Sequence, residues 1–121
     1  WQPMVRRHPV TGKKSLYISP IYNERIEGLA QDEAIRLIEE LTDFAARDEF
    51  VYRHHWTQDD IVMWDNRSVV HCAPRDIYES DFDRQLYRVT LLGDVPVGAD
   101  GRESVSIQGD PIIPIPAQAA E

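Results

Sequence analysis

Histidine and arginine are the residues of this chain whose chemistry points most directly to a site. His71 ends a short apolar run and precedes a polar stretch, Cys72 to Asp83, that has no clear period. Metal and substrate contacts are often built where a strand meets an irregular loop, because loops carry function on a rigid scaffold. The pattern therefore makes His71 a candidate ligand, with an ordinary hydrogen-bonded histidine as the alternative.

Arg84 and Arg88 form a second candidate. They belong to the segment Arg84 to Leu92, whose side chains alternate with a period of two and predict a strand. Residues four apart on a strand share a face and lie about 13 Å apart, at ~3.3 Å per residue. A guanidinium binds a carboxylate through a planar fork of donors. The pair indicates two anion-binding points on one face, and a solvated face is the alternative.

The cysteine and the other histidine residues are weaker candidates for a catalytic or metal-binding role. His71 and Cys72 are neighbours on a predicted strand, so their side chains point to opposite faces and do not readily form a nucleophile–base pair. The same holds for His54 and His55. The sequence contains no glycine-rich phosphate loop, no CxxC and no GxSxG.

Composition limits the class of partner. The chain has 121 residues, a formal net charge of -8 and 42% hydrophobic residues, which suits one domain that can bury a core. Its acidity argues against nucleic acid and against anionic lipid, since both need basic surfaces. No apolar run approaches the ~18 residues of a membrane helix. We expect neither nucleic acid nor a membrane as a partner, and the single Cys72 favours a cytoplasmic location.

One helix and several strands must position these residues. An apolar stripe predicts a helix over 31–47, and the segment SLYIS is a candidate for a short strand at 15–19. Residues 50–92 predict β-structure, with a turn at 65–67. From residue 97 the chain is rich in glycine and proline, which predicts an extended tail. The expected fold class is mainly β with one helix.

Three stretches carry longer motifs: HPVTGKKSLY at 8–17, WDNRSVVHCA at 64–73 and RQLYRVTLLGD at 84–94. Together they resemble the taurine dioxygenase and 2,4-dichlorophenoxyacetate dioxygenase family of Fe(II)- and 2-oxoglutarate-dependent oxygenases. The resemblance covers about residues 3–96. It implies part of a double-stranded β-helix, or jelly roll, with residues 1–96 as its C-terminal portion and 97–121 as an extended tail.

The resemblance implies roles for three residues. His71 matches the distal iron histidine of the family. Arg84 matches the arginine that pairs with the far carboxylate of 2-oxoglutarate, and Arg88 matches the arginine that holds the anionic group of the substrate. The implied cofactors are Fe(II) and 2-oxoglutarate as cosubstrate. The implied reaction hydroxylates a small anionic substrate, a sulfonate or a carboxylate, and converts 2-oxoglutarate to succinate and CO2.

One motif of the family is missing. No histidine is followed by x-Asp or x-Glu, which is the pattern that supplies the other two iron ligands. We therefore expect a fragment of such an enzyme, whose activity in isolation stays open, with His54 or His55 as lesser stand-in ligands. The alternative is a non-catalytic half-domain that self-associates or binds a partner or a small anion. A partial barrel exposes strand edges and apolar faces, so we expect a homo-oligomer.

Overall fold

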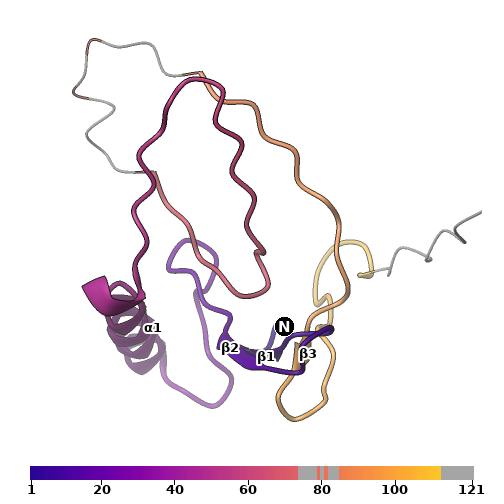
Figure 1. The fold of residues 1–121 in the computed structure, drawn as a ribbon. Coiled ribbons are helices and arrows are strands. Elements are labelled where there is room, and N and C mark those ends of the chain that lie inside the picture. Colours follow the sequence, from indigo (N-terminus) through magenta and orange to yellow (C-terminus); the bar gives the residue numbers. More distant parts are fainter. Residues whose placement is uncertain (74–78, 80, 82–84, 113–121) are drawn as a thin grey trace, which may run out of the picture.

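The structure is a computed structural model that describes residues 1–73, 79, 81 and 85–112. Three short strands form an antiparallel sheet of order β2-β1-β3 (Figure 1). The strands are β1 Val5–Arg7, β2 Lys14–Leu16 and β3 Val97–Gly98. β1 pairs Arg6 with Ser15 on one side and with Gly98 on the other. The sheet therefore joins the first residues of the chain to a segment almost a hundred residues later.

A tight turn links β1 to β2 directly after His8. Gly12 has a φ of 68°, in the left-handed region that glycine adopts without steric cost. Its N–H donates to the His8 carbonyl at 2.9 Å, and the His8 N–H donates to the Lys13 carbonyl at 2.8 Å. β2 overlaps the strand predicted at 15–19, whereas the sequence predicts no strand over the residues that form β1.

Helix α1 spans Gln31–Ala45 and confirms the helix predicted over 31–47. Asp32 and Glu33 lie in its first turn, where the helix dipole favours negative charge. A Glu33 carboxylate oxygen also accepts the N–H of Ala30 at 3.2 Å, which satisfies a donor at the start of the helix.

The hydrophobic core of the described residues is small. Ala34 and Ile38, from the apolar stripe of α1, are buried together with Ile18, which follows β2. No other large apolar side chain in the described part of the chain is buried to this extent, and many are strongly exposed. Burial of apolar surface drives folding, so α1 and the adjoining end of β2 supply most of the stabilisation visible here.

The β-structure predicted over 50–92 is wrong for the residues that the structure describes there. After the short 3-10 helix at Asp48–Phe50, this stretch runs as long limbs that rise away from the sheet and helix (Figure 1). No described residue of it belongs to a strand. Tyr87 and Val89, on one alternating face, are 91% and 87% exposed. Extended backbone becomes a sheet only when a second strand supplies hydrogen-bond partners, and the described residues place no such strand beside these limbs.

The turn predicted at 65–67 is present. The N–H groups of Ser68 and Val69 donate to the Asp65 carbonyl at 2.9 and 3.0 Å. An aspartate followed by asparagine is typical of a turn, because these short polar side chains bond to nearby backbone. The turn lies directly before the limb that carries His71.

The segment from residue 97 begins with structure that the sequence does not predict. Val97–Gly98 form β3 at the edge of the sheet, and the Ala99 N–H donates to the Val5 carbonyl at 2.9 Å. Residues 113–121, which hold most of the proline-rich stretch, lie outside the described residues. Among the helices described, none has the length and apolar character needed to cross a membrane.

Candidate functional site

The structure places two of the three predicted site residues on the surface. His71 is exposed, and its ring centroid lies 4.6 Å from that of Trp64. Arg88 is also exposed. Arg84 lies outside the described residues. His71 and Arg88 sit on different limbs, and no hydrogen bond or ion pair in the described part of the chain links one to the other.

The donor set for a metal ion is incomplete in the described residues. Within them, no three side chains of His, Cys, Asp or Glu gather closely enough to hold a metal. A non-haem iron site needs two histidines and a carboxylate. His71 alone does not meet that requirement, so the residues described here do not assemble an iron site.

His54, one of the lesser candidates, has a carboxylate partner that the sequence does not indicate. Its Nε2 lies 3.0 Å from Asp60 Oδ2, and the N–H and hydroxyl of Thr57 donate to the same carboxylate at 2.9 and 2.7 Å. These bonds, those from Thr57 above all, hold the pKa of Asp60 below its usual value. The arrangement is a closed turn with one histidine and one carboxylate.

A polar cluster joins the three motif stretches of the sequence. It consists of His8, Asp65, Arg67 and Asp94, and we call it the Asp65 cluster. His8 Nε2 lies 3.0 Å from Asp65 Oδ2. Arg67 donates to the same carboxylate from Nε at 2.8 Å and from Nη2 at 2.8 Å, and its Nη1 lies 3.6 Å from Asp94 Oδ2. The cluster thus connects the β1–β2 hairpin, the turn at 65–67 and the segment that leads into β3.

The hairpin turn fixes the hydrogen positions on the His8 ring. The backbone N–H groups of Val10 and Thr11 both approach His8 Nδ1 at 3.2 Å, so Nδ1 must accept. The ring hydrogen of a neutral imidazole then resides on Nε2, which donates to Asp65. The His8 side chain is only 8% exposed, whereas that of Asp65 is 39% exposed, so water is kept from this bond on the histidine side.

Charge pairing dominates the electrostatics of the Asp65 cluster. Hydrogen bonds from the Arg67 side chain, followed by the one from His8, hold the pKa of Asp65 well below its usual range. The same pairing raises the pKa of Arg67 above its usual value. Asp65 is therefore ionised at neutral pH, which suits a structural anchor and excludes it as a proton donor there.

Sequence reasoning assigns no role to the four residues of this cluster. All lie in the quoted motifs, yet their contacts depend on residues 57 positions apart meeting in space, as His8 and Asp65 do. A charged pair such as Asp65 and Arg67 inside a turn is also common without any function. The available signal is that each motif stretch contributes at least one charged or titratable residue besides His71, Arg84 and Arg88.

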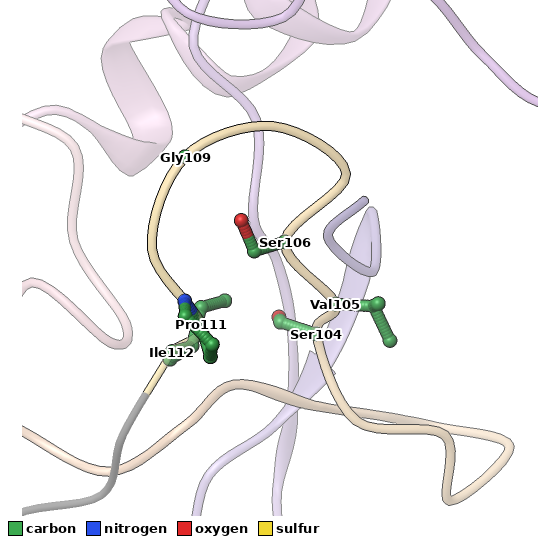
Figure 2. A pocket seen from close by; sticks show the side chains of 6 residues that line it. All are labelled: Ser104, Val105, Ser106, Gly109, Pro111 and Ile112. Carbon is green, nitrogen blue, oxygen red and sulfur yellow. The ribbon is translucent and has the colours of Figure 1, made fainter.

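Two cavities in the described part of the chain lie apart from the predicted site residues. One, of about 240 Å³, is formed where the loop after β3 curls round, and Figure 2 shows the side chains that line it: Ser104, Val105, Ser106, Gly109, Pro111 and Ile112. The other, of about 310 Å³, adjoins the Asp65 cluster and is lined by His8, Thr11, Lys13, Lys14, Ser15 and Ser68. Neither includes His71 or Arg88.

The three motif stretches on which the sequence resemblance rests thus meet in the Asp65 cluster, and comparison with known families identifies their class. The family model described as "Taurine catabolism dioxygenase TauD, TfdA family" matches residues 2–90, and the chain belongs to this family.

Relatives with known names agree with this assignment. The chain is 43% identical over 95 residues to an alpha-ketoglutarate-dependent 2,4-dichlorophenoxyacetate dioxygenase of Cupriavidus pinatubonensis, covering 78% of this chain and 32% of that protein. It is 39% identical over 99 residues to an alkylsulfatase of Acinetobacter baylyi, covering 82% of this chain and 30% of the relative. The chain therefore spans about a third of the length of these curated relatives.

Solved structures extend the likeness to three dimensions. The crystal structure of a taurine dioxygenase from Burkholderia xenovorans superposes with a TM-score of 0.85 at 50% identity, covering 90% of this chain and 39% of that one. The described sheet, helix and limbs thus have the arrangement of the corresponding part of a taurine dioxygenase.

Proposed function

We propose that this chain is part of an Fe(II)- and 2-oxoglutarate-dependent dioxygenase that hydroxylates a small anionic substrate, a sulfonate or a carboxylate. The family match over residues 2–90 carries the proposal. Relatives named for 2,4-dichlorophenoxyacetate and for taurine support a small acidic substrate. In such a reaction one atom of O2 enters the C–H bond of the substrate, and the other enters succinate, which forms from 2-oxoglutarate with loss of CO2.

Three residues have roles in this proposal. His71 is an iron ligand, Arg84 pairs with the far carboxylate of 2-oxoglutarate, and Arg88 holds the anionic group of the substrate. The planar fork of a guanidinium suits both anions, since it binds a carboxylate with two parallel bonds. Fixing both reactants by their charged ends brings the reacting carbon to one place, which lowers the entropic part of the barrier.

The missing iron ligands define the architecture that we propose. No three His, Cys, Asp or Glu side chains of the described residues gather into a metal site, so we propose that a His-x-Asp pair from outside this chain completes the site with His71. Residues 1–96 are then the C-terminal portion of a jelly-roll enzyme and 97–121 its tail. The likeness to taurine dioxygenases, of which this chain covers 39% and 41%, supports its being part of a longer enzyme. The enzyme names of the relatives make a non-catalytic half-domain the less supported alternative.

We also propose that the isolated chain forms a homo-oligomer in the cytoplasm. Large apolar side chains on the limbs are exposed, Ile61 at 89% and Met63 at 90% among them, and such surfaces associate in water. The single Cys72 is free and exposed, which suits a reducing compartment.

Anaerobic binding of 2-oxoglutarate tests the proposed function. The chain is titrated with 2-oxoglutarate in the presence of Fe(II), and heat is recorded together with the visible charge-transfer band of a chelated iron complex. We expect Arg84→Ala to lose binding and Arg53→Ala, at an exposed arginine paired with Asp48, to retain it. Unchanged binding in Arg84→Ala contradicts the role of that residue, and no binding by the unmodified chain contradicts the proposed function for it.

The visible band answers a separate question. A band means that the iron site is completed, either by ligands of this chain that the sequence does not reveal or by a second copy of the chain, and succinate release then identifies substrates. Binding of 2-oxoglutarate without a band means that the remaining iron ligands lie outside the chain, as we propose.

A further inference from the structure

We propose that the Asp65 cluster is a positioning device that fastens the base of segment 65–94. It holds two extended segments at a fixed spacing. Residues 68–73, which carry His71, are called the outgoing limb, and residues 85–94, which carry Arg88, are called the returning limb. The value of that spacing for catalysis rests on the proposed function, whereas the spacing itself is a property of this chain and is measured without iron or substrate.

Arg67 is the centre of the device. Its guanidinium donates to both oxygens of Asp65, at 2.8 and 3.1 Å from Nε, and its Nη1 lies 3.6 Å from Asp94. Its carbonyl accepts the Ser15 hydroxyl at 3.0 Å. One residue thus contacts the turn before the outgoing limb, the end of the returning limb and strand β2. A planar guanidinium can serve two carboxylates at once, which a lysine ammonium does less well.

Within the described residues, no other contact that could fix the spacing of the limbs is found. Among described residues from 70 to 93, no backbone hydrogen bond joins either limb to another element. Tyr87, Val89 and Leu91 of the returning limb are each at least 87% exposed, so they pack on little. Backbone without such contacts opens easily. The contacts at the base, where the limbs start and end, are the ones that can set their separation.

His8 anchors this base to the folded part of the molecule. Its side chain is 8% exposed and is held by two backbone N–H groups of the hairpin turn, so it is a rigid donor to Asp65. Other charged side chains near the cluster are those of Lys13 and Lys14, which line the adjacent cavity with His8. These contacts therefore fix the turn at 65–67 relative to the hairpin, and Arg67 in turn fixes Asp94 relative to that turn.

The chain contains a matched comparison for this arrangement. Asp100 and Arg102 have the same Asp-x-Arg spacing as Asp65 and Arg67, and Arg102 Nε lies 2.6 Å from Asp100 Oδ2. Their side chains are 52% and 77% exposed, against 39% and 31% for Asp65 and Arg67. Exposed ion pairs contribute little, since water and salt screen them. Arg102 Nη1 also lies 3.8 Å from Glu27 Oε2, so this pair reaches the segment before α1, but it joins neither limb.

The spacing of the limbs is measured by pulsed electron paramagnetic resonance. Cys72, the single cysteine, takes one spin label beside His71, and Val89→Cys takes the second beside Arg88. Dilution with unlabelled chain removes distances between copies. We expect one narrow distance peak, its loss in Arg67→Gln, and its retention in Arg102→Gln. Helical circular dichroism is recorded for each variant, because a general loss of structure would reduce it.

Several outcomes overturn the proposal. They are a broad distribution in the chain with Arg67 intact, a peak that stays narrow in Arg67→Gln, or equal broadening in Arg102→Gln. If Arg67→Gln loses the helical signal, the variant Asp94→Asn tests the proposal instead, because it removes only the contact between Arg67 and the returning limb. An unchanged peak in Asp94→Asn then refutes the device. A narrow peak in a chain that fails to bind 2-oxoglutarate contradicts the proposed function and leaves the positioning role standing.

Discussion

His8 Nε2 donates to Asp65 Oδ2 over 3.0 Å, although 57 residues separate the two along the chain. The bond has a defined direction, because Nδ1 of the same ring accepts two backbone N–H groups. It connects the HP-x-T-G turn to the WDNR turn, and Arg67 extends the connection to Asp94. Two motifs of a dioxygenase family are therefore joined by a contact that neither motif shows by itself.

Replacing His8 tests how much the His8–Asp65 contact contributes to the free energy of unfolding. His8→Ala leaves the N–H groups of Val10 and Thr11 without an acceptor and removes a donor from Asp65. Val10 and Thr11 are exposed, so water can satisfy their N–H groups, and we expect a loss of about 1 kcal/mol in the free energy of unfolding, which is the net contribution of a typical hydrogen bond. Urea titration measures it. The control is His55→Ala, at an exposed histidine, and an equal loss in both variants would show that the His8 contacts carry no particular weight.

Acid should weaken the fold through Asp65. The pKa of this carboxyl is lowered in the folded chain, first by Arg67 and then by His8. The pKa of an aspartate in an unfolded chain is about 3.9, so the unfolded chain binds the proton at a higher pH than the folded chain does. The contribution of Asp65 to the free energy of unfolding is therefore complete above the unfolded pKa, and it is lost as the pH falls toward the lower pKa of the folded chain.

The measurement is the urea midpoint over a series from neutral to acidic pH. We expect Asp65→Asn to be less stable than the unmodified chain at neutral pH and to lose less on acidification. Asp60 and Asp100 also have lowered pKa values, so both proteins retain some acid dependence. Parallel pH profiles for the two proteins would contradict the role assigned to Asp65.

Helix α1 offers a test of the small core. Ile38 is 3% exposed and Ile35, on the same helix, is 44% exposed. We expect Ile38→Ala to cost about 2–5 kcal/mol, from lost burial and from the cavity left behind. Ile35→Ala should cost about 1 kcal/mol or less, as substitutions at exposed positions usually do. Thermal unfolding followed by circular dichroism separates them, and similar losses would mean that the described core is not where the stability lies.

The elements that the sequence predicts well are those whose partners are local. The stripe that includes Ala34 and Ile38 predicts α1, since a helix satisfies its own backbone and needs only one apolar face covered. The turn at Asp65 is predicted for the same reason, because its hydrogen bonds span a few residues.

The elements that the sequence predicts poorly depend on distant partners. Alternation around Val89 is that of a strand, but a strand also needs a neighbour, and none lies beside it in the described residues. β3 pairs with β1 across most of the chain, and no local pattern at Gly98 indicates this. The Asp65 cluster belongs to the same class, because the bond from His8 arises only once the hairpin and the turn meet.

The exposed returning limb gives the last prediction, which concerns the oligomeric state. Val89 and Leu91 are each 87% exposed, on a limb with unpaired backbone groups, and such a segment associates with its like in water. We expect light scattering to give a mass above that of one 14.0 kDa chain. The double variant Val89→Lys with Leu91→Lys should lower the mass toward one chain, because the charges oppose edge pairing. Val10→Lys with Ile21→Lys is the control, since these residues are 78% and 79% exposed but lie on other segments. A dilution-stable monomer in the unmodified chain would refute self-association, and an equal effect of both double variants would show that the limb is not the contact surface.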